Sequence, residues 1–193
     1  MNPPRLTIIA GANGCGKTTL TRWDRKTFAS VPILDPDAIG KTLQSTIPST
    51  VASTFPIASA RHVLNAAKQL VSRAEGFVVE TTLSGHTYLQ MMLDVRIRGF
   101  EVVLVYIGTE NVEINLARIR NRVLAGGHNV PESDVRRRYK RSFENLPIAT
   151  ERSDHTILFD NSTEEGYRLI AVLEPPGNKW FKPTPGWANP VAR

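Results

Sequence analysis

Nine consecutive residues near the start of the chain have the types and the spacing needed to bind a nucleotide phosphate. Residues 11–19 read GANGCGKTT and fit the pattern G-x-x-x-x-G-K-[ST]. Glycines allow backbone N–H groups to turn inward around phosphate oxygens, the lysine reaches the β- and γ-phosphates, and the hydroxyl after it binds Mg²⁺. We expect the nucleotide to contact every residue of this loop, with Thr18 as the metal ligand: Gly11, Ala12, Asn13, Gly14, Cys15, Gly16, Lys17, Thr18 and Thr19.

Cys15 is the single cysteine of the chain and lies inside this loop. One cysteine excludes an internal disulfide, so a reducing compartment is the simpler expectation. Lys17 and the start of the predicted helix both favour a thiolate, so we hypothesise a pKa below the usual value of about 8.5 and protection of the thiol by Mg-ATP. The alternative is a side chain turned into the interior of the domain, where it would not react.

Carboxylates that follow apolar runs are candidates for the groups that handle a phosphoryl acceptor. Asp37 follows the run at residues 31–34, and a carboxylate there could orient an acceptor hydroxyl and take its proton. The alternative is that Asp35 or Asp37 caps the helix that follows. Glu80, after residues 77–79, would hold the acceptor or a water on Mg²⁺, or it would only bond to nearby backbone.

The net charge of +6 is concentrated between residues 118 and 141, where eight basic side chains stand against two acidic ones. We favour a cationic clamp over polyphosphate; a nucleic-acid surface and a solvated helix face are the alternatives. Arg118 and Arg122 are four residues apart and share one helix face, so one can lie over the adenine while the other reaches the phosphates. At least one of three consecutive arginines should point into the site, where a guanidinium suits the oxygens of a transferring phosphoryl group: Arg136, Arg137 and Arg138.

Strand and helix patterns alternate along the chain, which predicts an α/β three-layer sandwich with a parallel sheet of about five strands and an arginine-rich, lid-like helical segment. We predict strands at residues 5–10, 31–34, 77–79, 101–107 and 155–159, with a sixth at 167–173. We predict helices at residues 18–28, 57–74, 87–98 and 112–124, and one that begins at Pro131. We expect residues 1–173 to form one domain and residues 174–193 a proline-rich irregular tail, packed on the domain by Trp180 and Trp187.

The predicted sheet would bring the candidate groups together. In an open parallel sheet, ligands bind outside the carboxyl ends of the strands. The glycine-rich loop, Asp35 with Asp37, and Glu80 follow three different predicted strands, so they would meet at one edge. Asn161 follows the fifth predicted strand, and we expect it to border the adenine there.

Length and composition limit the class of protein. The 193 residues suit one domain whose core needs no disulfide. The chain has neither a signal-peptide pattern nor an apolar run of the roughly 18 residues that a membrane helix needs. We therefore expect a cytoplasmic protein with no membrane partner.

Several motifs together resemble the zeta-toxin family of P-loop kinases, in particular its short branch. The matching stretches are IIAGANGCGKTT, ILDPDAI, VVETTLSG, NLARIRNRVLAGGHNVPE with RRRYKRSFENL, and LFDNS, which cover about residues 6–162 in the family's order. The phosphate loop alone is common to many proteins, whereas GGHxVPE followed by R-R-Y-x-R-S is specific.

The resemblance implies a P-loop kinase fold and ATP-dependent phosphorylation of a hydroxyl group on a UDP-amino sugar such as UDP-N-acetylglucosamine. ATP and Mg²⁺ would then be bound, and a nucleotide sugar would be the acceptor. An antitoxin protein is the partner that the resemblance suggests and leaves unproven. A nucleic-acid partner is not expected.

The resemblance also implies roles for individual residues. One group would handle the phosphates and the transferring phosphoryl group, with Asp37 as the base: Lys17, Asp37, Arg122 and Arg138. A second group would hold the acceptor: Asp37, Glu80, Thr82 and Arg137. In this pattern either Arg137 or Arg138 neutralises the transferring group, and Arg118 with Asn161 lies at the nucleotide.

Two other functions stay open at this point. Another small-acceptor or nucleic-acid-end kinase would use the same loop, and a polynucleotide substrate would bind with strong salt dependence. A nucleotide-dependent switch without turnover needs no acceptor base, so Asp37 and Glu80 argue against it. Release of labelled γ-phosphate to a sugar nucleotide separates these functions.

Overall fold

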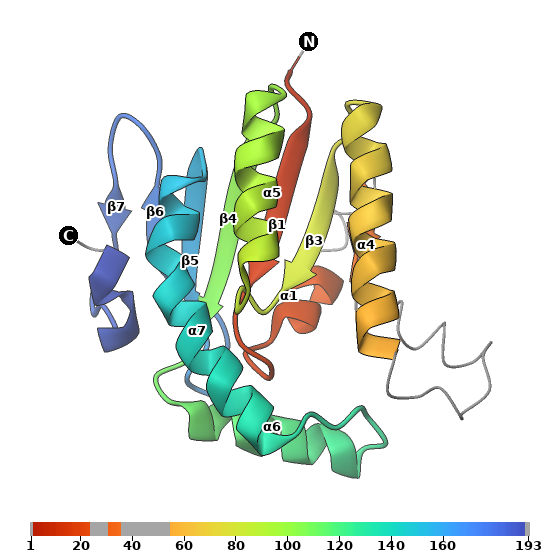
Figure 1. Ribbon diagram of the computed structural model, residues 1–193. Coiled ribbons are helices and arrows are strands. Elements are labelled where there is room, and N and C mark those ends of the chain that lie inside the picture. Colours follow the sequence, from red (N-terminus) through yellow and green to blue (C-terminus); the bar gives the residue numbers. More distant parts are fainter. Residues whose placement is uncertain (1, 24–30, 36–54, 192–193) are drawn as a thin grey trace.

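A seven-stranded sheet runs through the computed structural model, which describes residues 2–23, 31–35 and 55–191 (Figure 1). The strands lie in the order β2-β3-β1-β4-β5-β6-β7. The first five along the chain are parallel: β1 (Arg5–Ala10), β2 (Ile33–Leu34), β3 (Phe77–Thr81), β4 (Glu101–Gly108) and β5 (His155–Asp160). Two more extend one edge of the sheet as antiparallel strands: β6 (Arg168–Leu173) and β7 (Lys179–Trp180).

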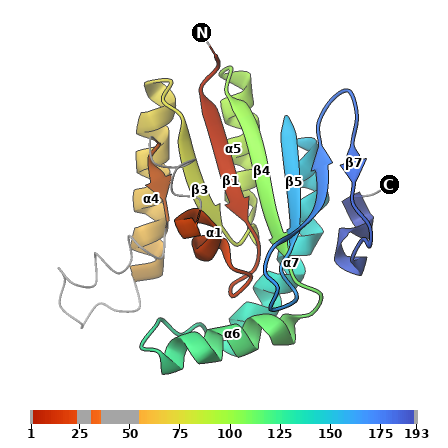
Figure 2. The same cartoon turned by 180° about the vertical axis from the view of Figure 1, so that it is seen from behind.

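Helices cover both faces of the sheet, as Figures 1 and 2 show from opposite sides. Three of them lie on one face: α4 (Phe55–Ser72), α5 (His86–Ile97) and α7 (Glu132–Glu151). The opposite face carries α1 (Lys17–Trp23), and α6 (Val112–Leu124) lies across the carboxyl ends of the parallel strands. The predicted α/β layering with a mostly parallel sheet is confirmed. Within the described ranges, no helix has the length and hydrophobicity of a bilayer-spanning segment.

The central strand β1 is apolar because helices bury both of its faces. Leu6, Ile8 and Ala10 are fully buried in the larger core, which α4, α5 and α7 complete. Ile9 points the other way and packs in a second cluster with Leu20 of α1. A strand buried on both sides has a continuous apolar sequence. Because β1 lies between β3 and β4, the loop that follows it stands inside the sheet's carboxyl edge and not at its border.

The arginine-rich helical segment consists of α6 and the first turns of α7. It has an apolar cluster of its own, separate from the larger core and formed by Leu116, Ile119, Val130 and Val135. Pro131 is the N-cap residue of α7 and not its first helical residue, and α7 continues through Pro147 to Glu151. This segment thus has a small core of its own, separate from the one that lies against the sheet.

The C-terminal tail differs from the predicted irregular segment because it adds a strand and a 3-10 helix. Trp180 belongs to β7, which pairs with β6, and the 3-10 helix spans Gly186–Val191. Trp187 lies 5.8 Å from the ring of Tyr106 and 5.7 Å from that of Phe143. The predicted packing of both tryptophans on the domain is confirmed, whereas the division of the chain at residue 173 stays a prediction.

Candidate functional site

The loop between β1 and α1 has a backbone that only glycine adopts readily. Gly11, Gly14 and Gly16 have φ angles of 141°, 82° and 108°, in the region that side chains disfavour. α1 begins at Lys17, whose Nζ donates hydrogen bonds to the carbonyl oxygens of Gly11 (2.7 Å) and Ala12 (3.2 Å). The ammonium group therefore lies against the loop itself, where it could exchange these oxygens for those of a phosphate.

Glu80 lies next to this loop and contacts the helix that follows it. Its two carboxylate oxygens accept hydrogen bonds from Thr18 Oγ1 (2.9 Å) and Thr21 Oγ1 (2.7 Å). The prediction that Glu80 follows its strand is wrong: it is the fourth residue of β3 (Phe77–Thr81) and only 4% exposed. Burial raises its pKa above the usual value, and the two threonine hydroxyls act in the opposite direction.

The second strand brings another carboxylate to the same edge. Asp35 follows β2, and its charge adds to the rise in the pKa of Glu80. The pKa of Tyr88 is raised to about 12, first by burial and then by the charge of Asp35. Asp37 lies outside the described residues, so its role as base or as helix cap stays a prediction. Thr82 Oγ1 shares a hydrogen bond of 2.9 Å with Ser84 Oγ.

Arg118 of α6 contacts the loop after β5, of which Asn161 is the first residue. The Arg118 guanidinium donates to the carbonyl oxygens of Asn161 (2.7 Å) and Thr163 (3.4 Å). The Asn161 side chain is buried and donates to the carbonyl oxygen of Cys15 at 2.8 Å. The amide that we expected at the adenine is therefore turned towards the phosphate loop.

One of the three consecutive arginines reaches the phosphate loop. Arg138 donates from Nη1 to Asn13 Oδ1 at 3.2 Å, and its Nη2 lies 3.9 Å from Asp134 Oδ2. Among the contacts of the described residues, neither Arg136 nor Arg137 reaches the loop in this way. The geometry thus separates Arg138 from its two neighbours.

The other arginines bind partners on their own segment. Arg136 forms ion pairs of 2.7 Å with Glu113 and 2.6 Å with Glu132. Arg137 pairs with Asp134 at 2.8 Å. Arg122 is exposed and donates to the carbonyl oxygen of His128 at 2.8 Å. Much of the charge expected in a clamp is thus balanced locally.

Two residues at the phosphate loop were given no role at the sequence level, although Asn115 begins the matching stretch NLARIRNRVLAGGHNVPE. Asn115 Nδ2 donates to the carbonyl oxygen of Asn13 at 2.7 Å, and the Tyr167 hydroxyl donates to that of Gly16 at 2.7 Å. Asn115 is fully buried and belongs to the inward face of α6 with Leu116. Two signals could have indicated it: its place in that matching stretch, and a polar residue on the apolar face of the predicted helix.

The lowered pKa proposed for Cys15 is wrong. The side chain is 1% exposed and packs with Ile9 and Leu20, so the inward orientation given as the alternative is the observed one. Burial raises the pKa of the thiol, and the nearby Lys17 lowers it by less. A buried apolar surrounding keeps the thiol protonated and unreactive.

No protein cluster that could hold a metal ion by itself exists in the described ranges, where no three histidine, cysteine or carboxylate side chains come together. The donor set nevertheless fits Mg²⁺ bound with a nucleotide. Mg²⁺ in such sites takes few protein ligands and completes its shell with water and phosphate oxygens. The exposed Thr18 hydroxyl, with the Glu80 carboxylate 2.9 Å behind it, suits that arrangement.

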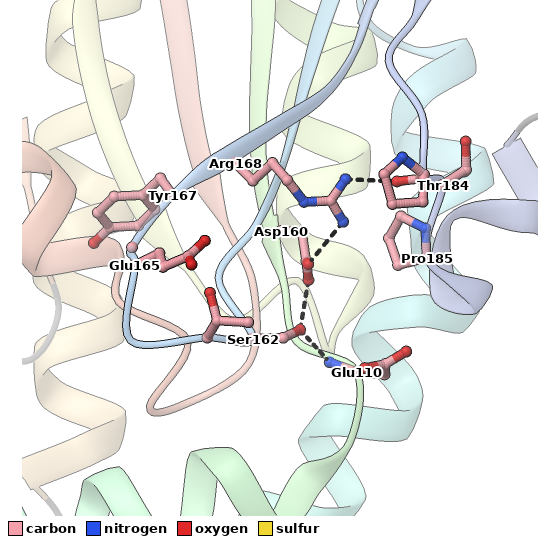
Figure 3. Close-up of a pocket in the computed structure, with 11 residues that line it drawn as sticks. Glu110, Asp160, Ser162, Glu165, Tyr167, Arg168, Thr184 and Pro185 are labelled. Carbon is pink, nitrogen blue, oxygen red and sulfur yellow. Dashed lines mark hydrogen bonds and ion pairs between the residues drawn. The ribbon is translucent and has the colours of Figure 1, made fainter.

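A pocket of about 570 Å³ lies beside the loop that joins β5 to β6 (Figure 3). Its lining comes from this loop, from Glu110 and from residues 183–185 of the tail, and not from residues 11–17. Tyr167 stands at one side of the pocket and Arg168 with Thr184 at the other. The phosphate loop and the tail therefore lie on two sides of one connecting segment.

Comparison with known proteins gives two sequence matches. A family model described as Zeta toxin matches residues 2–167. An uncharacterized protein of Haemophilus influenzae is 36% identical over 132 residues, which are 68% of this chain and 90% of that protein.

Solved structures with the same fold include a toxin–antitoxin protein. A chain of the PezAT chromosomal toxin–antitoxin system of Streptococcus pneumoniae superimposes with a TM-score of 0.66 and 18% identity, over 89% of this chain and 72% of that one. A structure of AvrRxo1-ORF1:-ORF2 with ATP superimposes with a TM-score of 0.74 and 16% identity, over 93% of this chain and 61% of that one. At such identities the likeness shows the fold.

Proposed function

The chain belongs to the zeta toxin family of P-loop kinases, and from this premise we propose that it transfers the γ-phosphate of ATP to a hydroxyl group of a nucleotide sugar such as UDP-N-acetylglucosamine. The observation that carries the proposal is the meeting of three groups at the carboxyl edge of the sheet. The glycine loop follows β1, the Thr18–Glu80 pair joins α1 to β3, and Arg138 extends from α7 to Asn13. Phosphoryl transfer needs this combination of an anion cradle, a metal-binding hydroxyl and a guanidinium.

On the donor side, the loop and the arginines bind the triphosphate of ATP. Lys17 leaves the carbonyl oxygens of Gly11 and Ala12 and binds the β- and γ-phosphates. Arg138 moves from Asn13 to the transferring group, and Arg122 joins it from α6, since a guanidinium suits the equatorial oxygens. Arg118 lies at the adenine of ATP, beside the loop that carries Asn161.

Thr18 would hold Mg²⁺, which would neutralise charge between the β- and γ-phosphates. Glu80 accepts the hydrogen bond of the Thr18 hydroxyl, which orients the oxygen of Thr18. The contacts of Glu80 thus favour a role at the metal over the role at the acceptor that the family's pattern implies. Both roles stay proposals.

On the acceptor side, the hydroxyl oxygen forms a bond to the γ-phosphorus as the bond from that phosphorus to the β–γ bridging oxygen breaks, which leaves ADP. Asp37 takes the proton of the hydroxyl group. Thr82 and Arg137 hold the acceptor. Arg137 first has to leave Asp134, an exposed pair of the kind that contributes only about 0–1 kcal/mol.

The test is transfer of labelled γ-phosphate from ATP to a panel of UDP-sugars, free sugars, nucleosides and 5′-hydroxyl oligonucleotides. We expect labelled product with a UDP-amino sugar and little dependence on salt. Product only with the oligonucleotides, lost steeply as salt rises, would show a nucleic-acid-end kinase. ATP binding without transfer to any acceptor would show a switch.

Asp37→Asn distinguishes the base from the helix cap. Loss of a positioned base should lower kcat by roughly 10²-fold or more while the affinity for ATP stays the same. If the variant mainly melts at a lower temperature and turns over normally, Asp37 is a cap.

A protein partner forms a separate part of the proposal. The structure from Streptococcus pneumoniae describes a toxin–antitoxin system, and we extend a partner of that kind to this chain. Toxicity on expression, relieved by a protein encoded next to it, would support this; harmless expression would contradict it.

A further inference from the structure

Three carbonyl oxygens of the phosphate loop accept hydrogen bonds from side chains far away in the sequence. Asn115 donates to Asn13 at 2.7 Å, Asn161 to Cys15 at 2.8 Å and Tyr167 to Gly16 at 2.7 Å. Asn115 belongs to α6, Asn161 directly follows β5, and Tyr167 directly precedes β6. We call these three side chains, Asn115, Asn161 and Tyr167, the brace.

The brace controls the direction of the loop's N–H groups. A trans peptide unit is planar, so a carbonyl group and the N–H of the next residue point in opposite directions. The brace holds the carbonyls of Asn13 and Cys15, and Tyr167 holds that of Gly16 together with the α1 amides of Thr19 (3.0 Å) and Leu20 (3.1 Å). With these carbonyls directed outward, the N–H groups of residues 14, 16 and 17 face inward. Those are groups that a phosphate-binding loop offers to the anion.

Two glycines of the loop lie where other parts of the chain approach closely: the brace side chains at Gly16 and the backbone of α6 at Gly14. A Cβ atom at Gly16 would lie 2.7 Å from Asn161 Nδ2 and 2.8 Å from the Tyr167 hydroxyl. A Cβ atom at Gly14 would lie 2.6 Å from the backbone oxygen of Asn115. The absence of a side chain at Gly14 and Gly16 thus leaves room for these neighbours on the outer side of the loop.

Hydrogen bonds fix the amide orientation of Asn115 and the backbone of Asn161. Thr109 Oγ1 donates to Asn115 Oδ1, so the NH₂ group of Asn115 faces Asn13. The Asn115 amide therefore cannot turn round without losing both of its hydrogen bonds inside the protein. Arg118 Nη1 donates to the backbone carbonyl oxygen of Asn161 at 2.7 Å, which holds the main chain from which the Asn161 amide extends.

The segment that carries Asn161 and Tyr167 is itself anchored by Asp160 (Figure 3). The Asp160 carboxylate accepts from Ser162 Oγ (2.6 Å), Arg168 Nη2 (3.2 Å) and Trp187 Nε1 (3.3 Å). Arg168 also donates to the carbonyl oxygen of Pro183. The two ends of the segment are thereby joined to each other and to the tail.

We propose that Asn115, Asn161 and Tyr167 are positioning residues that hold the phosphate loop in its anion-binding conformation before the nucleotide arrives. The inference rests on the proposed function, because it concerns the ATP-binding loop of that kinase. The brace would act through the loop carbonyls that it contacts, so its effect should be the same for any ligand that carries the same phosphates. It also accounts for part of the tail's function, since the tail anchors two of the three donors.

The test compares binding of ATP and of inorganic tripolyphosphate, which has no base or ribose. Tyr167→Phe removes one hydroxyl donor and should weaken the binding of both ligands by a similar factor, roughly 5-fold. Asn161→Ala should weaken both by roughly 10-fold, because it removes an amide that reaches the loop. KM for ATP should rise by the same factors while kcat changes little, since a held N–H group serves ground state and transition state alike.

Tyr106→Phe is the matched control. It removes a buried hydroxyl that bonds to Ser142 of α7 at 2.9 Å and not to a carbonyl of the loop. Its melting temperature should fall, but its binding of tripolyphosphate should equal that of the wild type. A general loss of stability therefore cannot imitate the expected result.

Each other outcome overturns the inference in a different way. Wild-type tripolyphosphate affinity in both brace variants would show that the loop needs no brace. A loss of affinity for ATP alone would show that Tyr167 or Asn161 contacts the adenine, as the sequence suggested for Asn161. If the wild-type protein binds neither ligand, the kinase proposal itself fails, and the brace fails with it.

Discussion

The two sides of the phosphate loop are built on opposite principles. On the brace side, Asn115 and Asn161 are 0% and 7% exposed, and their amides reach the loop backbone directly. On the arginine side, the side chains of Arg137 and Arg138 are 52% and 34% exposed and lie near a carboxylate of their own helix, Asp134. One side is fixed by burial, and the other is held by ion pairs in contact with water.

This difference separates binding from catalysis. A buried amide has one arrangement that satisfies it, so the brace shapes the loop before any ligand arrives. An exposed ion pair contributes only about 0–1 kcal/mol, so a triphosphate can draw the arginines away from their partners at little cost. We therefore expect changes in the brace to act on affinity and changes in the arginines to act on turnover.

Lys17 belongs to the loop itself, between the brace and the arginines. It binds the loop carbonyls in this structure and would bind phosphate in the complex. Lys17→Ala should reduce ATP turnover by roughly 10³-fold or more, the upper range for the loss of one electrostatic donor. Its melting temperature should match that of the wild type, since the Lys17 side chain is not part of the core. Normal turnover in the folded variant would contradict the assignment of the loop.

Arg138→Ala tests the arginine side. It should lower kcat and kcat/KM together by roughly 10²-fold, the sign of an interaction made mainly in the transition state. Arg141→Ala, three residues further along α7 and also exposed, is the matched control and should keep normal turnover. A rise in KM alone for Arg138→Ala would place this arginine with the brace and end the contrast.

Thr109→Val tests the brace side indirectly. The change keeps the shape of a buried side chain but removes the hydroxyl that orients Asn115, so tripolyphosphate should bind roughly 3-fold more weakly. Thr156→Val is the control, because the Thr156 hydroxyl has no hydrogen-bond partner among the described residues. Equal binding by both variants would show that Asn115 needs no orienting group.

Glu80 also lies beside the phosphate loop, and it is buried like the brace but can carry a charge. We expect its substitution to have the smallest effect of the four, a change in melting temperature. Its folded-state pKa is raised, so the folded protein binds the proton more tightly and loses stability as pH rises from about 4.5 through that pKa. Glu80→Gln removes this loss. The melting temperature of the variant minus that of the wild type should be more positive at pH 7 than at pH 4.5; a constant difference would contradict the raised pKa.

The sequence by itself determined the features that depend on neighbouring residues. The phosphate loop is one continuous stretch, and its glycines, Lys17 and Thr18 follow from the types and spacing of nine residues. The five parallel strands and their helices were also predictable, because burial on both faces of a sheet or on one face of a helix leaves a periodic pattern. For the candidate site, the sequence indicated which residues stand at or near strand ends, such as Glu80 and Asn161, while their roles stay predictions.

The tertiary structure alone decided which distant groups meet at that loop. Asn115 and Tyr167 lie 102 and 151 residues from their partners, and no local pattern records such a contact. Local position also gave the wrong direction for the pKa of Cys15, because burial removes the water that would stabilise a thiolate and outweighs the nearby lysine. Contact and desolvation depend on which parts of the chain pack together, whereas spacing along the chain states only which residues are available.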